Sequence, residues 1–429
     1  MTPFLKQVAD HYMARGGISD LCFIFPNRRS QVFFTKYLGE AVKEDGTPIV
    51  APKMLTINDF FFRISGNKPA DRVNLLLDLY ECYKNLNPKH ETLDEFIFWG
   101  DVILGDFDDV DKYLVDPVRL FANVTEFKEI QDSYSYLTEN QRRAIESFIS
   151  HFSSEGRLTV NLNSDNPNVK ERFLQIWNIL LPLYNNFRER LAGKGLAYEG
   201  MVYRGLAARL DLESAVDVLN AAFGEVNEYV FVGLNALNEC EKKVMRRMRD
   251  AGIAEFCWDY SSEMVRNPLN KSSFFMSRNV KEFPQAFEMD LEGLKTPEIE
   301  VISVPSSVGQ TKLIPSVVKD ERCAVVLPDE SLLIPVLNSI PEEIKDINVT
   351  MGYPMKNSAF FDFMTLVSAM QMHLRQKDGK WYYYHNQVWS LFSSSIFRRV
   401  TQGDDAVRAR VKEIKDGMKY YIPQEDLSG

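Results

Sequence analysis

The sequence has little cysteine and histidine and no long apolar segment. Its five cysteines lie far apart in 429 residues, with no C-x-x-C pair and no histidine at ligand spacing. We therefore expect buried thiols rather than a zinc or iron–sulfur site, and predict no cofactor and no metal. No apolar run reaches the roughly 20 residues that span a bilayer, and the first 15 residues lack a signal peptide's apolar core. These absences predict a cytoplasmic protein with no membrane contact.

The chain also lacks an excess of positive charge. It carries 60 acidic and 50 basic residues, a net charge of -10, which argues against indiscriminate coating of nucleic acid but leaves room for a local basic track. With 45% hydrophobic and 26% charged residues, the composition is that of an ordinary globular protein. The length exceeds what one hydrophobic core supports, so two or more domains are expected.

Hydrophobic periodicity predicts an α/β arrangement at the start of the chain. The apolar run 21–25 is typical of a strand buried on both faces of a parallel sheet. It lies between helices predicted over 3–15 and 31–42, and a second strand is expected within 49–56. Asn58 or Asp59 is then expected to cap a helix that begins at Phe60.

The middle of the chain is predicted to be helical, and strands return after it. Segments with helical periodicity are 73–83, 93–104, 117–130, 139–150, 169–191 and 198–209. Strands are predicted at 229–232, 254–258, 300–304, 323–327 and 347–351. The Pro-, Lys- and Glu-rich stretch 291–298 is the predicted domain boundary.

Four local segments carry a family resemblance through their order and spacing. They are FIFPNRRS at 23–30, DFDDVDKYL at 106–114, VFVGLNALNE at 230–239, and AVVLPDE at 324–330 followed by NVTMGYP at 348–354. Together they resemble AddB-type (RecC-like) subunits of double-strand-break-repair helicase-nucleases, in particular the Bacteroides-group branch.

The resemblance implies two RecA-like, superfamily 1 helicase-like parallel-sheet domains, the first with a large all-helical insertion. Domain 1A would comprise 1–70 and 211–292, and the insertion 1B would be 71–210. Domain 2A would span 299–374, and 375–429 would begin a helical 2B-like region.

The residues of a nucleotide-hydrolysis site are absent from the positions that the resemblance assigns to them. No glycine-rich phosphate loop precedes Phe23, and the degenerate Walker B segment ends in Gly233 and Leu234 instead of two acids. The stretch Leu327-Pro328-Asp329 lacks the arginine expected after the motif IV strand. The sequence GQTK at 309–312 has the letters of a phosphate loop in the wrong order, and we assign it no phosphate-binding role; Gln310 is expected to start a helix.

These departures predict a chain without catalytic residues. The resemblance implies a non-catalytic scaffold that binds single-stranded or forked DNA and an AddA-type helicase-nuclease motor subunit during processing of broken ends. Two alternatives stay open: an ATP-independent PD-(D/E)XK exonuclease whose active domain lies beyond residue 429, and a protein-interaction scaffold without DNA affinity.

Candidate DNA contacts fall in three places. Asn27, Arg28, Arg29 and Ser30 are expected on a loop where related helicases contact the strand backbone, although the arginines could equally pair with nearby acids. Thr56 could contact the backbone too, but helix capping also explains it. Lys242, Arg246 and Arg249 share one face of a basic helix, for which a solvated face or a partner contact is the favoured interpretation.

An acidic cluster and an aromatic run are better explained by structural roles than by functional ones. The acids Asp106, Asp108, Asp109 and Asp111 do not match an EF-hand loop, and no companion residues support a hydrolase, so helix capping and solvent exposure are predicted. The aromatic run 381–385 could stack unpaired bases but is more typical of a core or interface.

Overall fold

The computed structural model of the chain divides into two compact units, Met1–Pro297 and Glu298–Gly429. The division falls within the stretch 291–298 where composition predicts a boundary. No helix among the described residues is long and apolar enough to cross a membrane. The predicted helix 139–150 lies outside the described residues, which are 2–88, 90–126, 167–224, 226–260, 265, 267, 269–289, 298–318, 320 and 323–427.

The first unit contains the parallel sheet that the apolar runs predict. Its strands are β1 (Leu21–Phe25), β2 (Lys53–Thr56), β5 (Glu228–Val232) and β6 (Ala254–Cys257), in the order β2-β1-β5-β6, and all neighbouring pairs are parallel. Every residue of β1 is buried. The prediction of a mixed α/β fold with a parallel sheet is therefore confirmed.

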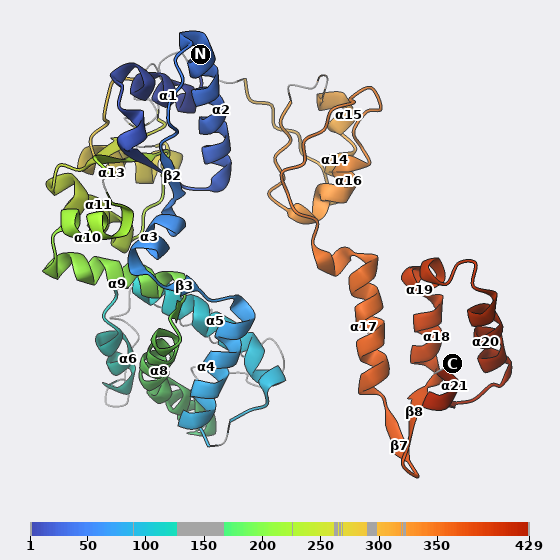
Figure 1. Cartoon of the computed structure of the whole chain (residues 1–429). Helices are drawn as coiled ribbons and strands as arrows, with labels where there is room; N and C mark the ends of the chain where they lie inside the picture. Colours follow the sequence, from blue (N-terminus) through green and yellow to red (C-terminus); the bar gives the residue numbers. More distant parts are fainter. Residues whose placement is uncertain are drawn as a thin grey trace. The chain divides into compact units, whose positions relative to one another are not determined.

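Helices cover both faces of this sheet, because alternate side chains of each strand enter different cores. Cys22 and Ile24 pack on one side, whereas Phe23 and Phe25 pack on the other. The second of these sides is covered by α1 (Phe4–Arg15) and α2 (Arg28–Asp45) (Figure 1). The first side is covered by α3 (Ile57–Ser65), α9 (Glu199–Leu212), α10 (Ala215–Phe223), α11 (Glu239–Asp250) and α13 (Phe274–Glu282).

The middle of the first unit is a helical group with its own core (Figure 1). The chain enters it at β3 (Lys68–Pro69) and leaves it at β4 (Leu196–Ala197), and these two short strands pair in parallel. Large buried side chains such as Phe96, Phe107 and Phe187 fill this core. Its helices are α4 (Arg72–Leu86), α5 (Leu93–Lys112), α6 (Pro117–Glu126) and α8 (Pro167–Gly193).

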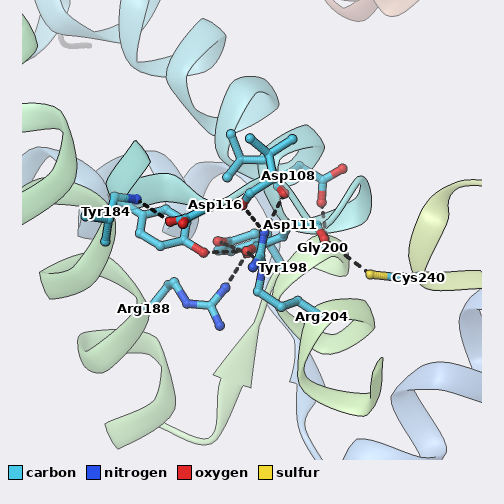
Figure 2. Close-up of polar contacts among 12 residues, drawn as sticks. Asp108, Asp111, Asp116, Tyr184, Arg188, Tyr198, Gly200, Arg204 and Cys240 are labelled. Atoms are coloured by element: carbon cyan, nitrogen blue, oxygen red, sulfur yellow. Dashed lines mark hydrogen bonds and ion pairs between the residues drawn. The ribbon is translucent and has the colours of Figure 1, made fainter. Parts of the chain in front are cut away.

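A buried carboxylate joins this helical group to the sheet domain (Figure 2). Asp111, at the end of α5, is 0% exposed, so the prediction that it is solvent-exposed is wrong. It forms ion pairs with Arg188 of α8 and Arg204 of α9. It also accepts hydrogen bonds from the hydroxyls of Tyr184 and Tyr198. Its partners lie far along the chain, which is why the local acidic pattern did not reveal them.

Residues next to Asp111 add further contacts between the helical group and the sheet domain. The Cys240 thiol of α11 donates to the carbonyl of Asp111 at 3.2 Å. The Gly200 N–H donates to Asp108 Oδ1 at 2.6 Å, and a Cβ on Gly200 would lie 2.5 Å from the Asp108 carbonyl oxygen. Glycine at position 200 therefore allows α9 to approach α5 closely. Lys112 completes the contact with salt bridges to Asp108 at 2.6 Å and Glu199 at 2.7 Å.

The second unit has a small antiparallel sheet, β7 (Arg375–Lys377), β8 (Lys380–Tyr384) and β9 (Tyr421–Pro423). Part of the aromatic run 381–385 forms β8, where Tyr383 is buried and Trp381 is exposed. The unit's helices are α14 (Ser307–Thr311), α15 (Ile314–Val317), α16 (Leu333–Leu337), α17 (Ala359–Met372), α18 (His385–Ser393), α19 (Ser395–Val400), α20 (Asp405–Asp416) and α21 (Gln424–Leu427).

Three strands predicted in the second unit are not formed. Segments 300–304, 323–327 and 347–351 run without ladder pairing, and Val301 and Val326 are 88% and 82% exposed. A β-branched run becomes a strand only where another strand pairs its backbone and a layer covers one face. In the described part of this unit, no strand pairs with these segments and no layer covers them. Gln310 also lies inside α14 rather than at its start, which Ser306 caps.

Candidate nucleic-acid interface

Three of the predicted site segments meet at one edge of the parallel sheet. Residues 27–30 follow β1, Thr56 ends β2, and Gly233 and Leu234 follow β5. Parallel strands place their carboxyl ends at the same edge, where ligands of open α/β sheets bind. The strand order therefore brings together segments that are far apart in the sequence.

The segment after β1 is the start of a helix, so the prediction that Arg28 and Arg29 lie on a loop is wrong. Asn27 caps α2, and its side-chain oxygen accepts from the Ser30 N–H at 3.0 Å and the Ser30 hydroxyl at 3.3 Å. Asparagine is among the best N-cap residues, which explains why the helix begins earlier than predicted. Arg28 and Arg29 are its first helical residues, and both are exposed. The helix N-terminus adds a partial positive charge beside them.

Thr56 also caps a helix, so the prediction that Asn58 or Asp59 is the cap is wrong. The Thr56 hydroxyl accepts from the Asp59 N–H at 3.1 Å and donates to Asp59 Oδ2 at 2.8 Å. Asn58 instead donates to Glu199 Oε1 at 2.8 Å and accepts from the Tyr203 hydroxyl. Thr56 is buried, and a DNA contact through its hydroxyl would compete with the cap.

The segment after β5 is apolar and closely packed. Gly233 has φ of 69°, and its N–H donates to the Cys257 carbonyl at 2.9 Å. A Cβ at Gly233 would lie 3.3 Å from Cε1 of Phe4, and Leu234 is buried. The first residue of α1, Phe4, therefore lies beside the turn that follows β5. The sequence did not single out Phe4, because only the fold brings α1 to this turn.

The basic side chains of α11 all have acidic partners. Lys242 pairs with Glu239 at 2.7 Å and Arg249 with Asp250 at 2.8 Å, and Arg246 pairs with Glu282. Lys243 and Arg247 both pair with Asp211, at 2.5 and 3.1 Å. A phosphate bound to this helix would have to displace these partners, which favours the solvated-face interpretation.

Burial keeps most cysteines in the thiol form. It raises the pKa of Cys22, Cys240 and Cys257 to about 12, and a metal ligand must be a thiolate. Cys323 is exposed, so the prediction that all five are buried is wrong for that residue. Within the described ranges no three His, Cys, Asp or Glu side chains form a group that could hold a metal ion.

Comparison with known proteins finds no family model that matches the chain and no curated protein that matches it.

Proposed function

We propose that the chain is a non-catalytic, helicase-like scaffold of a DNA double-strand-break repair complex. In this proposal it is similar to AddB-type subunits, holds single-stranded or forked DNA, and pairs with an AddA-type motor subunit. Its first unit would be a RecA-like domain with a helical insertion. Residues 299–374, where the predicted strands are not formed, would correspond to the second helicase-like domain by their place in the sequence.

The observation that carries the proposal is the contrast along the carboxyl edge of the sheet. At the end of β5, Gly233 packs close to the Phe4 ring and Leu234 is buried. At the end of β1, Arg28 and Arg29 are exposed at the N-terminus of α2. Beside β5 the edge therefore has packed apolar residues and no acid at Gly233 or Leu234, while beside β1 it presents positive charge, which supports binding of a phosphate backbone without hydrolysis.

A helix of the second unit supports the proposal that the chain binds a motor subunit. No residue of α17 is buried, and Phe360, Phe361, Met364 and Met372 are all exposed. Exposed apolar clusters of this kind favour a protein contact. We propose α17 as the element that contacts the motor subunit.

The DNA half is tested by salt-titrated fluorescence anisotropy with a labelled single-stranded oligonucleotide. Changing Arg28→Ala together with Arg29→Ala should weaken binding and make the salt slope shallower by about 1.4, since each phosphate contact to a single strand contributes about 0.7. The matched control is Lys243→Ala with Arg247→Ala, which also removes two positive charges. We expect the control to change binding little, because both of its side chains pair with Asp211. No binding at low salt would refute DNA binding, and equal effects of the two double changes would show that Arg28 and Arg29 do not contact the strand.

A further inference from the structure

One face of α2 combines exposed apolar and basic side chains. Val32 is 67% exposed and Phe33 is 45% exposed. Arg28, Arg29 and Lys36 are also exposed, and each lies within four residues of Val32 or Phe33 along the helix. We call these five residues the α2 face.

Helical spacing places the basic groups around the aromatic ring. Arg29 is four residues before Phe33 and Lys36 is three residues after it, so both neighbour it on the helix surface. The opposite side of α2 is buried in the core through Phe34 and Leu38. Phe33 is therefore not needed to hold the helix on the sheet.

Another exposed phenylalanine of the first unit has the opposite surroundings. Phe98 of α5 is 67% exposed, but its helical neighbours are Asp94, Glu95 and Asp101. A ring beside Asp94 and Glu95 disfavours phosphate, even though Asp101 pairs with Arg72, whereas a ring between Arg29 and Lys36 favours it. The charge around Phe33 thus selects an anionic partner that also offers a flat apolar surface.

We propose that Phe33 stacks on an unpaired base of a single strand, while Arg28, Arg29 and Lys36 contact the adjoining phosphates. This inference rests on the proposed function and adds the position of a base to it. Unpaired bases expose the flat faces that an aromatic ring stacks on, whereas duplex DNA hides them. The exposed pair of Lys36 with Glu40, at 3.8 Å, is weak enough to yield to a phosphate.

The test compares Phe33→Ala, Phe33→Trp and Phe98→Ala for binding to a single-stranded and a duplex oligonucleotide of the same length. Phe33→Ala should weaken single-strand binding about tenfold and leave duplex binding and the salt slope unchanged. Phe33→Trp should retain single-strand affinity, and its tryptophan fluorescence should be quenched by the single strand. Phe98→Ala should match the unchanged protein.

The outcomes separate this inference from the proposed function. If the unchanged protein binds single strands and Phe33→Ala binds them equally well, the stacking inference is refuted and the proposed function stands. If Phe33→Ala weakens duplex and single-strand binding alike, the ring does not stack specifically on unpaired bases, and the inference also fails. If the unchanged protein binds no DNA, both fail. Unfolding midpoints of the variants show whether each is folded.

Discussion

Asp111 shows how one side chain can hold two parts of a fold together. Its buried carboxylate is surrounded by Arg188 and Tyr184 of α8, Arg204 of α9, and Tyr198, the residue before α9. Burial is the main cause that raises the pKa of Tyr184, and hydrogen bonding to this carboxylate raises it further. The tyrosines therefore remain donors at neutral pH, and the cluster keeps its pairing.

Removing this carboxylate should destabilise the first unit strongly. Asp111→Ala leaves Arg188 and Arg204 without their buried partner, so we expect a loss of about 3–5 kcal/mol in the free energy of unfolding, measured with urea. Asp101→Ala is the control, because its salt bridge to Arg72 is exposed and should contribute at most about 1 kcal/mol. Similar small losses for both variants would contradict this account of the joint.

Glu241 makes stability depend on pH. Burial raises the pKa of its carboxyl to about 7, from an ordinary value of 4.5. Between these values the folded protein binds a proton that the unfolded chain does not, so stability falls as pH rises from about 4.5 to 7 and then levels off. Glu241 is also the N3 residue of the α11 capping box, where it accepts from the Asn238 N–H at 2.9 Å.

Replacing Glu241 with glutamine should remove this dependence and keep the cap, because glutamine also serves at that position. We expect Glu241→Gln to raise the free energy of unfolding by about 3 kcal/mol at pH 8 and by about 1 kcal/mol at pH 5. Urea unfolding across this range measures the effect. A gain of equal size at both values would show that the carboxyl does not titrate as described.

In helix α2, the residue that caps the helix also determines where the basic residues of the candidate site lie. Asn27 fixes where the helix begins and hence where Arg28 and Arg29 emerge. Asn27→Ala should cost about 1 kcal/mol of stability and weaken single-strand binding, because the first turn is less well ordered. Asn27→Ser should restore both properties, as serine caps equally well. Unchanged unfolding and anisotropy curves for Asn27→Ala would rule out this role.

Elements were predictable where burial dictated the pattern. The run 21–25 forms β1 with the predicted bounds because all five side chains are buried. The predicted helix 31–42 began three residues too late, because the Asn27 cap was not recognised. Segment 300–304 has the composition of a strand, but strand formation depends on pairing from elsewhere in the chain, which composition does not report.

At the scale of the whole molecule, the candidate site could be predicted only in part. The sequence located 27–30, Thr56 and Gly233 as separate points, and their meeting at one sheet edge follows from the order β2-β1-β5-β6. It did not predict that Phe4 packs beside Gly233 or that acidic residues of other elements pair with basic side chains of α11. Both depend on contacts between elements that are distant in sequence.

The central proposal is that this chain binds DNA without hydrolysing nucleotide. The most direct measurement is phosphate release from ATP and magnesium by the purified protein, at single-stranded DNA concentrations that saturate binding in the anisotropy assay. With Phe4 packed beside Gly233 and no acid at Gly233 or Leu234, we predict no release above the rate without protein, with or without DNA. Phosphate release that rises with added single-stranded DNA would contradict the account.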